Sequence, residues 1–451
     1  MASLPASAQP KPGEPKQASV ERLLNVLSTD LTNPTLTPAQ RTATLEHLKV
    51  HGRDPNGSGA IFTREGIDTL GKYAFDQPNS DISTSREALR CLANALLLNP
   101  DCRQIFVDLG YALKAAERFE TASIDDEFLL SRILFLATFT PPVPPGLLDT
   151  TLPASLAAAL DRHTTAPHMQ MQEMALTETL KLLFSLGHHT ASPHLLITLP
   201  PLLTLLTTIT LPSPPLQGTI IHLINAPLSL PLTATTPALF PPGAEFKLVD
   251  RLIAILDAAT RDPDLDDAAA PLVTLLRKLL ELAPEAVVAH MQKVLLPAPE
   301  ERDAPLGTSK TLPSRLLRLT AAATAPGLRD HVASLLFELS GSSPETYVEN
   351  VGYGYASGLL VSRGLDGGMG SGAGVGKEKG VAREVNPVTG QWVEMEPVKA
   401  DPFEGMTMEE KEREAEKMFV LFERLRKTGV VDVKNPVQQA VEEGRFEELE
   451  D

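Results

Sequence analysis

Apolar residues recur along this chain at the three- and four-residue spacing that is typical of amphipathic helices. In the segment 39–50, for example, Leu45 and Leu48 lie on one face, and Pro38 stands where a first helical turn tolerates proline. The same spacing predicts helices over 20–27, 64–74, 85–98, 128–139, 169–186, 246–259, 268–282, 284–295, 312–322 and 329–339. Alternating strand-like runs joined by Asn-Gly turns are missing, which disfavours a sheet core.

Proline clusters at 141–146, 212–215 and 241–243 separate these helices. Comparable Leu-rich helices recur at roughly 40–50 residues, the range of armadillo and HEAT units. The sequence therefore predicts an all-α, armadillo/HEAT-like helical solenoid, in which stacked helix pairs leave a long concave surface for a partner. Because no clean repeat consensus is visible, an irregular all-helical globule is the alternative.

Composition divides the chain into four parts. A tail rich in Pro, Ala, Ser and Lys precedes the solenoid, and a Gly-dominated stretch too poor in apolar residues to order itself follows it. We therefore expect a disordered N-terminal tail at 1–19, the solenoid at 20–365, a flexible loop and linker at 366–400, and a C-terminal amphipathic helix with its tail at 401–451.

The C-terminal helix is expected to begin at a capping box formed by Thr407 and Glu410. One of its faces is apolar and is formed by Ala415, Met418, Phe419, Phe422 and Leu425. A helix on a flexible tether either docks on its own solenoid or binds a partner, and its spacing alone favours the first.

The bulk composition narrows the functional classes. Aromatic residues make up only 5% of the chain and Trp392 is the sole tryptophan, so Leu, Ala and Val must form the core. A formal net charge of −17 argues against nucleic-acid binding and fits a partner with a basic surface. Cys91 and Cys102 are too few for a disulfide framework, which favours a reducing, cytoplasmic location. The most apolar stretch, 195–211, is broken by prolines and is shorter than the ~20 residues of a membrane span, so we expect no integral membrane segment.

Motifs of cofactor, metal and covalent chemistry fail on spacing. The segment 374–377 ends in Gly-Lys like a phosphate loop, but Ser371 stands where the first glycine belongs and Glu378 where Ser or Thr should follow. The acidic run at 262–267 lacks the glycine and the glutamate of a calcium loop, and these acids are expected to cap the helix near residue 268. The histidines at 188, 189 and 194 have no Cys or acidic partner nearby and indicate a surface loop. We therefore expect no cofactor, no metal and no covalent catalysis.

Two segments, 351–365 (VGYGYASGLLVSRGL) and 401–418 (DPFEGMTMEEKEREAEKM), flank the Gly-rich loop and resemble the synembryn family. The resemblance continues in order through further segments: 86–96, 129–138, 178–186, 221–227, 312–319 and 385–390. Ser185 stands where the family pattern leads us to expect Asn.

This resemblance implies a chaperone and guanine nucleotide exchange factor for heterotrimeric G-protein α subunits (Gα), in their GDP-bound or nucleotide-free form. It implies that the concave face receives the C-terminal helix of Gα and that the C-terminal helical region embraces the GTPase core. GDP then leaves, and the nucleotide-free state is held until GTP binds. We expect a cytoplasmic monomer that reaches the plasma membrane through Gα. The alternative is an armadillo-type peptide-binding adaptor without effect on nucleotide exchange, which would have no need of the segment from Asp401 onward.

The carboxylate and unpaired carbonyls at the end of a partner helix call for cations and amides. On the inner-helix candidates these are Lys49, Arg53, Arg90, Asn94, Arg132 and Lys181. The resemblance places Lys49, Arg53 and Asn94 at family contacts, whereas the other interpretation is that Asn94 satisfies backbone groups between repeats and the cations are solvated. Further contact candidates are Arg315 and Arg318, which share a helix face and either reach Gα or pair with acidic neighbours, and Met418, Phe419 and Phe422 in the tail. Phe184 is expected in the core.

Overall fold

The computed structural model describes residues 4–76, 82–139, 142–165, 169–262, 265, 267–322, 325–365, 376–377, 384–396, 407, 410, 413, 417 and 420. The chain divides into two compact units, Met1–Val393 and Glu394–Asp451. The first unit is helical almost throughout, and within the described residues its strands are limited to one short pair.

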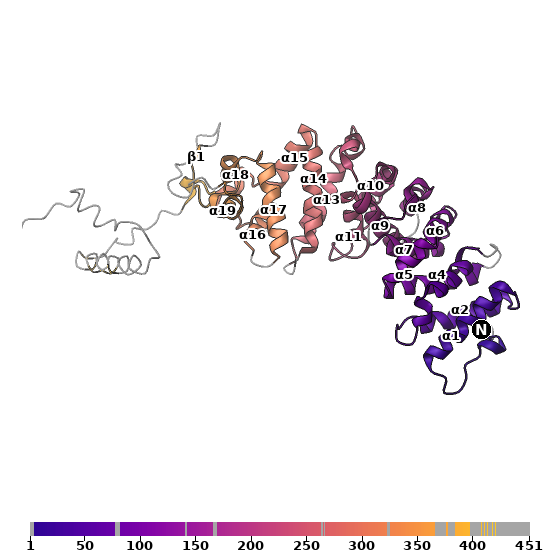
Figure 1. The fold of residues 1–451 in the computed structure, drawn as a ribbon. Helices are drawn as coiled ribbons and strands as arrows, with labels where there is room; N and C mark the ends of the chain where they lie inside the picture. Colours follow the sequence, from indigo (N-terminus) through magenta and orange to yellow (C-terminus); the bar gives the residue numbers. More distant parts are fainter. Residues whose placement is uncertain are drawn as a thin grey trace, which may run out of the picture. The chain divides into compact units, whose positions relative to one another are not determined.

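The helices of the first unit follow one another along the chain (Figure 1). Their bounds are α1 Lys16–Thr32, α2 Pro38–His51, α3 Arg64–Gly71, α4 Ile82–Leu98, α5 Asp101–Asp108, α6 Tyr111–Phe119, α7 Ile124–Thr138, α8 Leu152–Thr165, α9 Gln170–Thr190, α10 Leu199–Thr208, α11 Thr219–Leu228, α12 Thr236–Leu239, α13 Lys247–Ala259, α14 Ala270–Leu282, α15 Glu285–Leu295, α16 Leu312–Thr320, α17 Pro326–Leu339, α18 Pro344–Val351 and α19 Tyr353–Ser362. The strands are β1 Gly376–Lys377 and β2 Glu384–Val385, which pair antiparallel.

Seven helices form one continuous row. In the order α2, α4, α7, α9, α11, α14 and α17, each packs against the next, although many residues separate them in sequence. The other long helices form a second layer, because α1, α3, α5, α6, α8, α10, α13, α15 and α16 each pack against a member of the row. This two-layer stack of helix pairs is an armadillo/HEAT-like solenoid, as the sequence predicted. We call the seven helices the row helices, and their side turned away from the second layer the row face.

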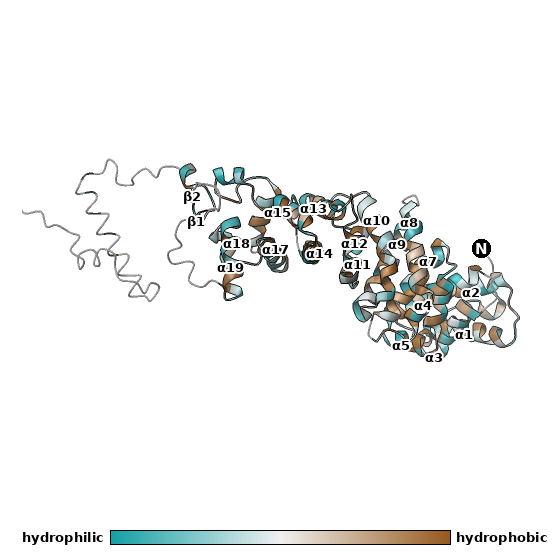
Figure 2. Ribbon diagram, turned by 90° about the horizontal axis from the view of Figure 1, so that it is seen from above, coloured by the Kyte–Doolittle hydropathy of each residue, from teal (hydrophilic) through white to brown (hydrophobic). Residues whose placement is uncertain are grey.

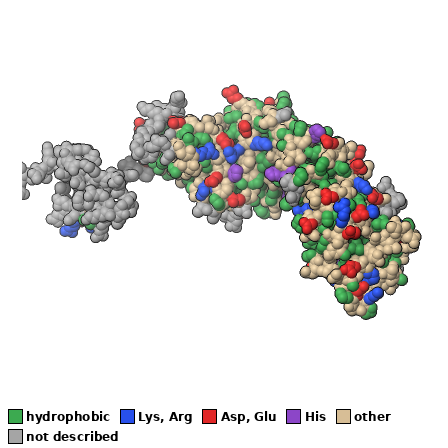
Figure 3. Space-filling view, viewed as in Figure 1, with side chains coloured by type: hydrophobic (Ala, Val, Ile, Leu, Met, Phe, Trp, Pro, Cys, Tyr) green, Lys and Arg blue, Asp and Glu red, His purple; other side chains and the backbone are tan. Residues whose placement is uncertain are grey.

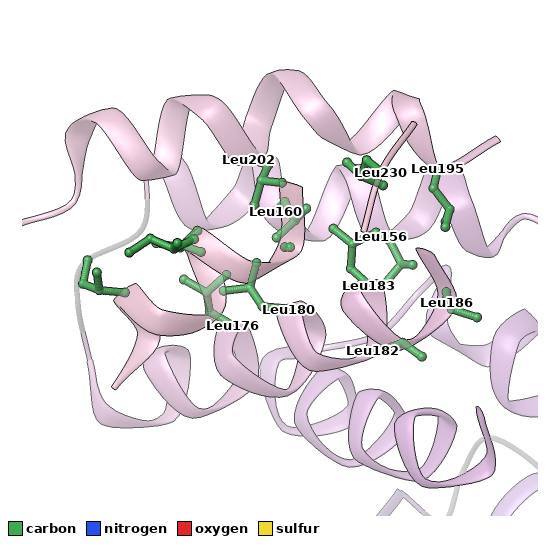
Figure 4. Packing of buried hydrophobic residues seen from close by; sticks show 14 of the residues in the cluster. Leu156, Leu160, Leu176, Leu180, Leu182, Leu183, Leu186, Leu195, Leu202 and Leu230 are labelled. Atoms are coloured by element: carbon green, nitrogen blue, oxygen red, sulfur yellow. The ribbon is translucent and has the colours of Figure 1, made fainter. Parts of the chain in front are cut away.

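Leucine supplies most of the contacts between the two layers. Where α8, α9 and α10 meet, Leu156, Leu160, Leu180, Leu183 and Leu202 are fully buried and point toward one another (Figure 4). The pairs on α8 and α9 stand four and three residues apart, so each of these helices turns one apolar side inward. Figure 2 shows the hydrophobic side lying between neighbouring helices. The expectation that aliphatic residues form the core is confirmed.

Eight of the described helices lie outside the ranges predicted from the periodicity: α5, α6, α8, α10, α11, α12, α18 and α19. In α8, Leu152, Leu156, Ala159 and Leu160 are all fully buried, at spacings of three or four residues. The apolar spacing of α8 was therefore present in the sequence, in a short helix that follows the proline cluster at 141–146.

The ordered part begins earlier than the predicted boundary at residue 20. Helix α1 begins at Lys16, and Ala8 is only 1% exposed beneath it. Arg22 and Glu14 form an ion pair at 2.6 Å that holds the preceding segment against the helix. A Pro-rich composition suggested disorder, but Pro15 here takes the N-cap position, just before the first helical turn.

Part of the predicted linker at 366–400 is packed as well. Trp392 is 2% exposed, and its backbone N–H donates to the carbonyl of Arg302 at 2.8 Å. The guanidinium of Arg302 in turn donates to the carbonyl of Gly390 at 2.8 Å. A single aromatic side chain with these backbone contacts fixes residues 384–393 on the end of the solenoid, which composition alone did not reveal.

In the second unit the predicted capping box is confirmed. The Glu410 carboxylate accepts from the backbone N–H of Thr407 at 3.0 Å, and the Thr407 hydroxyl accepts from the N–H of Glu410 at 3.3 Å. Among the described helices of the chain, none combines the length and apolar character that crossing a bilayer requires.

Candidate functional site

Five of the predicted contact residues line one hollow on the row face. Its volume is about 260 Å³, and it lies where the end of α2 meets α4 and α7. The lining residues are Lys49, Arg53, Arg90, Ala93, Asn94, Phe128, Leu129 and Arg132. We call it the basic hollow, because four cations and no carboxylate are among these described residues. The lining of the hollow is therefore positively charged, although the chain as a whole has a net charge of −17.

Helical geometry brings these side chains together. Arg90 and Asn94 stand four residues apart on α4 and therefore lie on one side of that helix. Lys49 occupies the last turn of α2, where the helix dipole favours a cation, and Arg53 follows just after the helix ends. Arg132 lies in the middle of α7, the next row helix.

Two buried glutamates bind most of the cations of this face. Glu87, 7% exposed, forms ion pairs with Lys49 at 2.5 Å and with Arg90. Glu178, 6% exposed, pairs with Lys181 at 2.9 Å and with Arg132 at 3.5 Å. The structure thus continues the site from the basic hollow to Lys181 on α9. Figure 3 shows the wider pattern, with Lys and Arg side chains interspersed among Asp and Glu on the face that it displays.

Arg53 and Asn94 differ from the paired cations. No hydrogen bond or ion pair joins either side chain to another described residue of the protein, and Arg53 is exposed while Asn94 is half-buried. Within the described residues, no hydrogen bond from the Asn94 side chain to a backbone group supports the interpretation that Asn94 satisfies backbone groups between repeats. Both side chains are available to a ligand in the hollow.

An apolar stripe lies further along the same helices. Leu97 at the end of α4 and Phe139 just after α7 are 46% and 55% exposed. Phe184 on α9 is 36% exposed and stacks on His188, so the expectation that it lies in the core is wrong. Leu97 and Phe184 follow Asn94 and Lys181 by three residues and therefore lie on the same side of their helices. Phe139 follows Arg132 by seven residues, and the guanidinium of Arg103 on α5 lies over its ring. Sequence reasoning missed the stripe, although the spacing from the cations was a usable signal.

The charge of Lys181 also affects the neighbouring row helix. Burial lowers the pKa of His222 on α11, and Lys181 lowers it further, while Glu178 opposes the shift. The neutral imidazole is therefore favoured beside the cation. His222 extends the polar part of the row face, and it was not among the predicted contact residues.

Arg315 and Arg318 lie apart from this site, on α16 of the second layer. Arg315 forms an ion pair with Asp257 on α13 and donates to the Thr260 hydroxyl at 3.0 Å. Arg318 donates to the carbonyls of Gly307 and Ser309. Of the two interpretations of Arg315, the acidic-neighbour pairing is the one present in this structure. The tail candidates Met418, Phe419 and Phe422 lie outside the described residues.

Other candidate chemistry takes structural roles. His188 and His189 lie in the last turn of α9, which corrects the predicted surface loop, and no group of three metal-ligating side chains is found among the described residues. Asp267 accepts from the backbone N–H of Leu328 at 2.8 Å and so caps α17, whereas capping near residue 268 was expected. Burial raises the pKa of both thiols, that of Cys102 to about 11, so neither is poised as a nucleophile at neutral pH.

Comparison with known proteins identifies relatives over nearly the whole chain. The family model described as "Guanine nucleotide exchange factor synembryn" matches residues 44–445. The protein named Chaperone Ric-8A from Macaca fascicularis is 25% identical over 467 residues, covering 93% of this chain and 86% of that one. Its Xenopus tropicalis counterpart is 26% identical over 497 residues, covering 97% and 90%. A solved structure titled as an engineered protein aligns with a TM-score of 0.43 at 16% identity, over 58% of this chain and 97% of that chain.

Proposed function

Because the chain belongs to the synembryn family of guanine nucleotide exchange factors, we propose that it binds the C-terminal helix of a G-protein α subunit in the basic hollow. The observation that carries this proposal is the hollow itself, in which four cations and the unpartnered amide of Asn94 meet. The end of a helix presents free carbonyl groups and, at a chain terminus, a carboxylate. Cations and an amide donor are the groups that such an end requires.

The apolar stripe supports the same ligand. A helix that docks in a groove usually turns an apolar face inward. The apolar face of such a helix would pack against the exposed side chains of Leu97, Phe139 and Phe184, which lie one to two helical turns from the cations. The row face therefore fits an amphipathic helix that ends in a carboxylate better than it fits an extended acidic peptide.

The mechanism follows from differential binding. The C-terminal helix of Gα must leave its own GTPase core to lie in the hollow, and its removal loosens the nucleotide pocket. The chain then binds the open, nucleotide-free state more tightly than the closed state, and this difference in affinity is what shifts the equilibrium. This mechanism does not require the chain to contact the nucleotide.

Three further points complete the proposal. By binding a newly made Gα chain with the same affinity, the protein would act as its chaperone. The segment 401–451 would embrace the GTPase core, with Met418, Phe419 and Phe422 as its contact residues. The chain would act as a monomer in the cytoplasm and reach the plasma membrane through Gα.

The test is GDP release from purified, GDP-loaded Gα with the full chain and with a chain truncated before Asp401. Stimulated release by the full chain, with a stable complex that GTP dissociates, is the expected result. The truncated chain is expected to bind the C-terminal peptide of Gα in part and to lose exchange activity. Binding of the peptide by the full chain without any release of GDP would instead establish the peptide-binding adaptor.

A further inference from the structure

Each of the two buried glutamates of the row face is shared by two cations. We propose that Glu87 and Glu178 are internal competitors of the partner's carboxylate, and that they set the affinity and the salt dependence of the row face. This inference rests on the proposed function, because it concerns how the same surface receives its ligand.

The geometry of the free protein carries the inference. The carboxylates of Glu87 and Glu178 retain only 9% and 8% side-chain exposure, so they are largely withdrawn from water. Lys49 and Arg90 bind the two oxygens of Glu87, one oxygen each. Lys181 and Arg132 share one oxygen of Glu178. Four of the five cations of the site are thus already paired, although two carboxylate charges offset only part of their positive charge. Arg53 alone is left without a described partner.

An arriving carboxylate therefore exchanges one ion pair for another at these positions. Part of the Coulomb energy gained with Arg90 or Lys49 is offset by the loss or weakening of the pair with Glu87. Exchange of pairs leaves the number of exposed charges nearly unchanged, so added salt should weaken binding only mildly. A surface with free cations would bind an anionic helix end more tightly and with a steeper salt dependence.

The opposite role is physically possible and predicts the opposite result. A carboxylate that holds two cations in place would pre-organise them, and its removal would weaken ligand binding. Substitution by glutamine separates the two roles, because it keeps the length of the side chain and one acceptor oxygen while it removes the charge. Competition predicts tighter binding by the variant, whereas positioning predicts weaker binding.

The experiment measures binding of a labelled peptide that spans the C-terminal helix of Gα, with a free carboxylate, to the full chain. Glu87→Gln and Glu178→Gln are each expected to bind about three- to fivefold more tightly than wild type at low salt. Both variants should also lose affinity more steeply as salt rises. The matched control is Glu117→Gln, which makes the same charge change at an exposed site on α6 outside the row.

A thermal midpoint within a few degrees of wild type establishes that each variant is folded. Unchanged or weaker binding by both glutamine variants, while wild type binds, overturns the inference and leaves the proposed function standing. An equal gain in Glu117→Gln also overturns it, because the effect would then be one of net charge. If wild type itself fails to bind the peptide, the proposed function fails and the inference falls with it.

Discussion

The backbone N–H of Tyr353 donates a 2.7 Å hydrogen bond to the carbonyl of Pro387. The next amide, that of Gly354, donates to Val388 at 3.1 Å, so the start of α19 is joined to a segment more than thirty residues later. Gly352 has a φ of 78°, and a Cβ there would lie 3.0 Å from the carbonyl oxygen of Val388. Two stretches that carry the family resemblance, 351–365 and 385–390, are therefore in direct contact.

This contact predicts that the strap formed by residues 384–393 depends on its one large apolar side chain. Trp392→Ala removes a buried indole, at a cost of about 3 kcal/mol, and the backbone bonds of the strap should open more often. Hydrogen exchange of the backbone amides at positions 353 and 392 is expected to accelerate by roughly tenfold or more. Val393→Ala, at a neighbouring position that is 40% exposed, is the control and should leave exchange nearly unchanged. Equal exchange in wild type and Trp392→Ala would mean that the strap does not need this side chain.

The sequence predicted much of the fold because helical periodicity is a local property. The spacing of Leu45, Leu48 and their equivalents is enough to place most helices, and the distance between helices is enough for the solenoid. The strap was not predicted, because a buried Trp392 in a polar, Gly-flanked stretch depends on Arg302 and its neighbours about ninety residues earlier.

The candidate site was predicted in part for the same reason. Lys49, Arg90 and Asn94 could be placed on inner helices from spacing within each helix, and the structure brings them into one hollow. Their partners were not foreseen, because Glu87 reaches Lys49 only through the packing of α4 on α2. Arg315 shows the reverse case, in which a cation chosen for its helix face is oriented by an acid on another helix.

The two unpartnered side chains of the basic hollow should matter most to ligand binding. Arg53→Ala and Asn94→Ala are each expected to weaken binding of the Gα C-terminal peptide by about five- to thirtyfold, or about 1–2 kcal/mol. GDP release should slow in proportion, while unfolding in urea is unchanged, because neither side chain bonds to another described residue. Lys293→Ala, an exposed cation on α15, is the matched control. Full activity of both hollow variants would show that the partner binds elsewhere.

Arg315 is expected to behave as a structural residue. Its side chain is 13% exposed and binds Asp257 and Thr260, which joins α16 to α13. Arg315→Ala should lower the free energy of unfolding by about 1–2 kcal/mol, since the link between α16 and α13 is lost while Asp257 keeps its ion pair with Arg261. Peptide affinity, measured below the unfolding temperature, should stay within twofold of wild type, roughly the size of an indirect effect. A large loss of peptide affinity in a variant of normal stability would instead show that Arg315 contacts the partner.

The stability of the solenoid should fall in acid through Glu127, which is fully buried at the start of α7. Burial alone would raise the pKa of this carboxyl group, but hydrogen bonds from His163 at 2.8 Å and Thr179 at 3.0 Å, with the charge of Arg162 nearby, leave it below the ordinary value of 4.5. A lowered pKa in the folded state means that the unfolded chain takes up the proton first. The stabilisation from ionised Glu127 is therefore complete above pH 4.5 and is lost as the pH falls through the lower pKa of the folded state.

Glu127→Gln tests this dependence. At pH 7 the variant should lose about 3 kcal/mol of unfolding free energy, because a buried charge network loses its anion. The difference from wild type should shrink as the pH is lowered below 4.5, since wild type then carries a protonated, neutral side chain as well. Urea unfolding followed by circular dichroism between pH 7 and pH 3 measures both curves, with Glu117→Gln as the exposed control. Parallel curves over that range would show that the ionisation of Glu127 is not linked to folding.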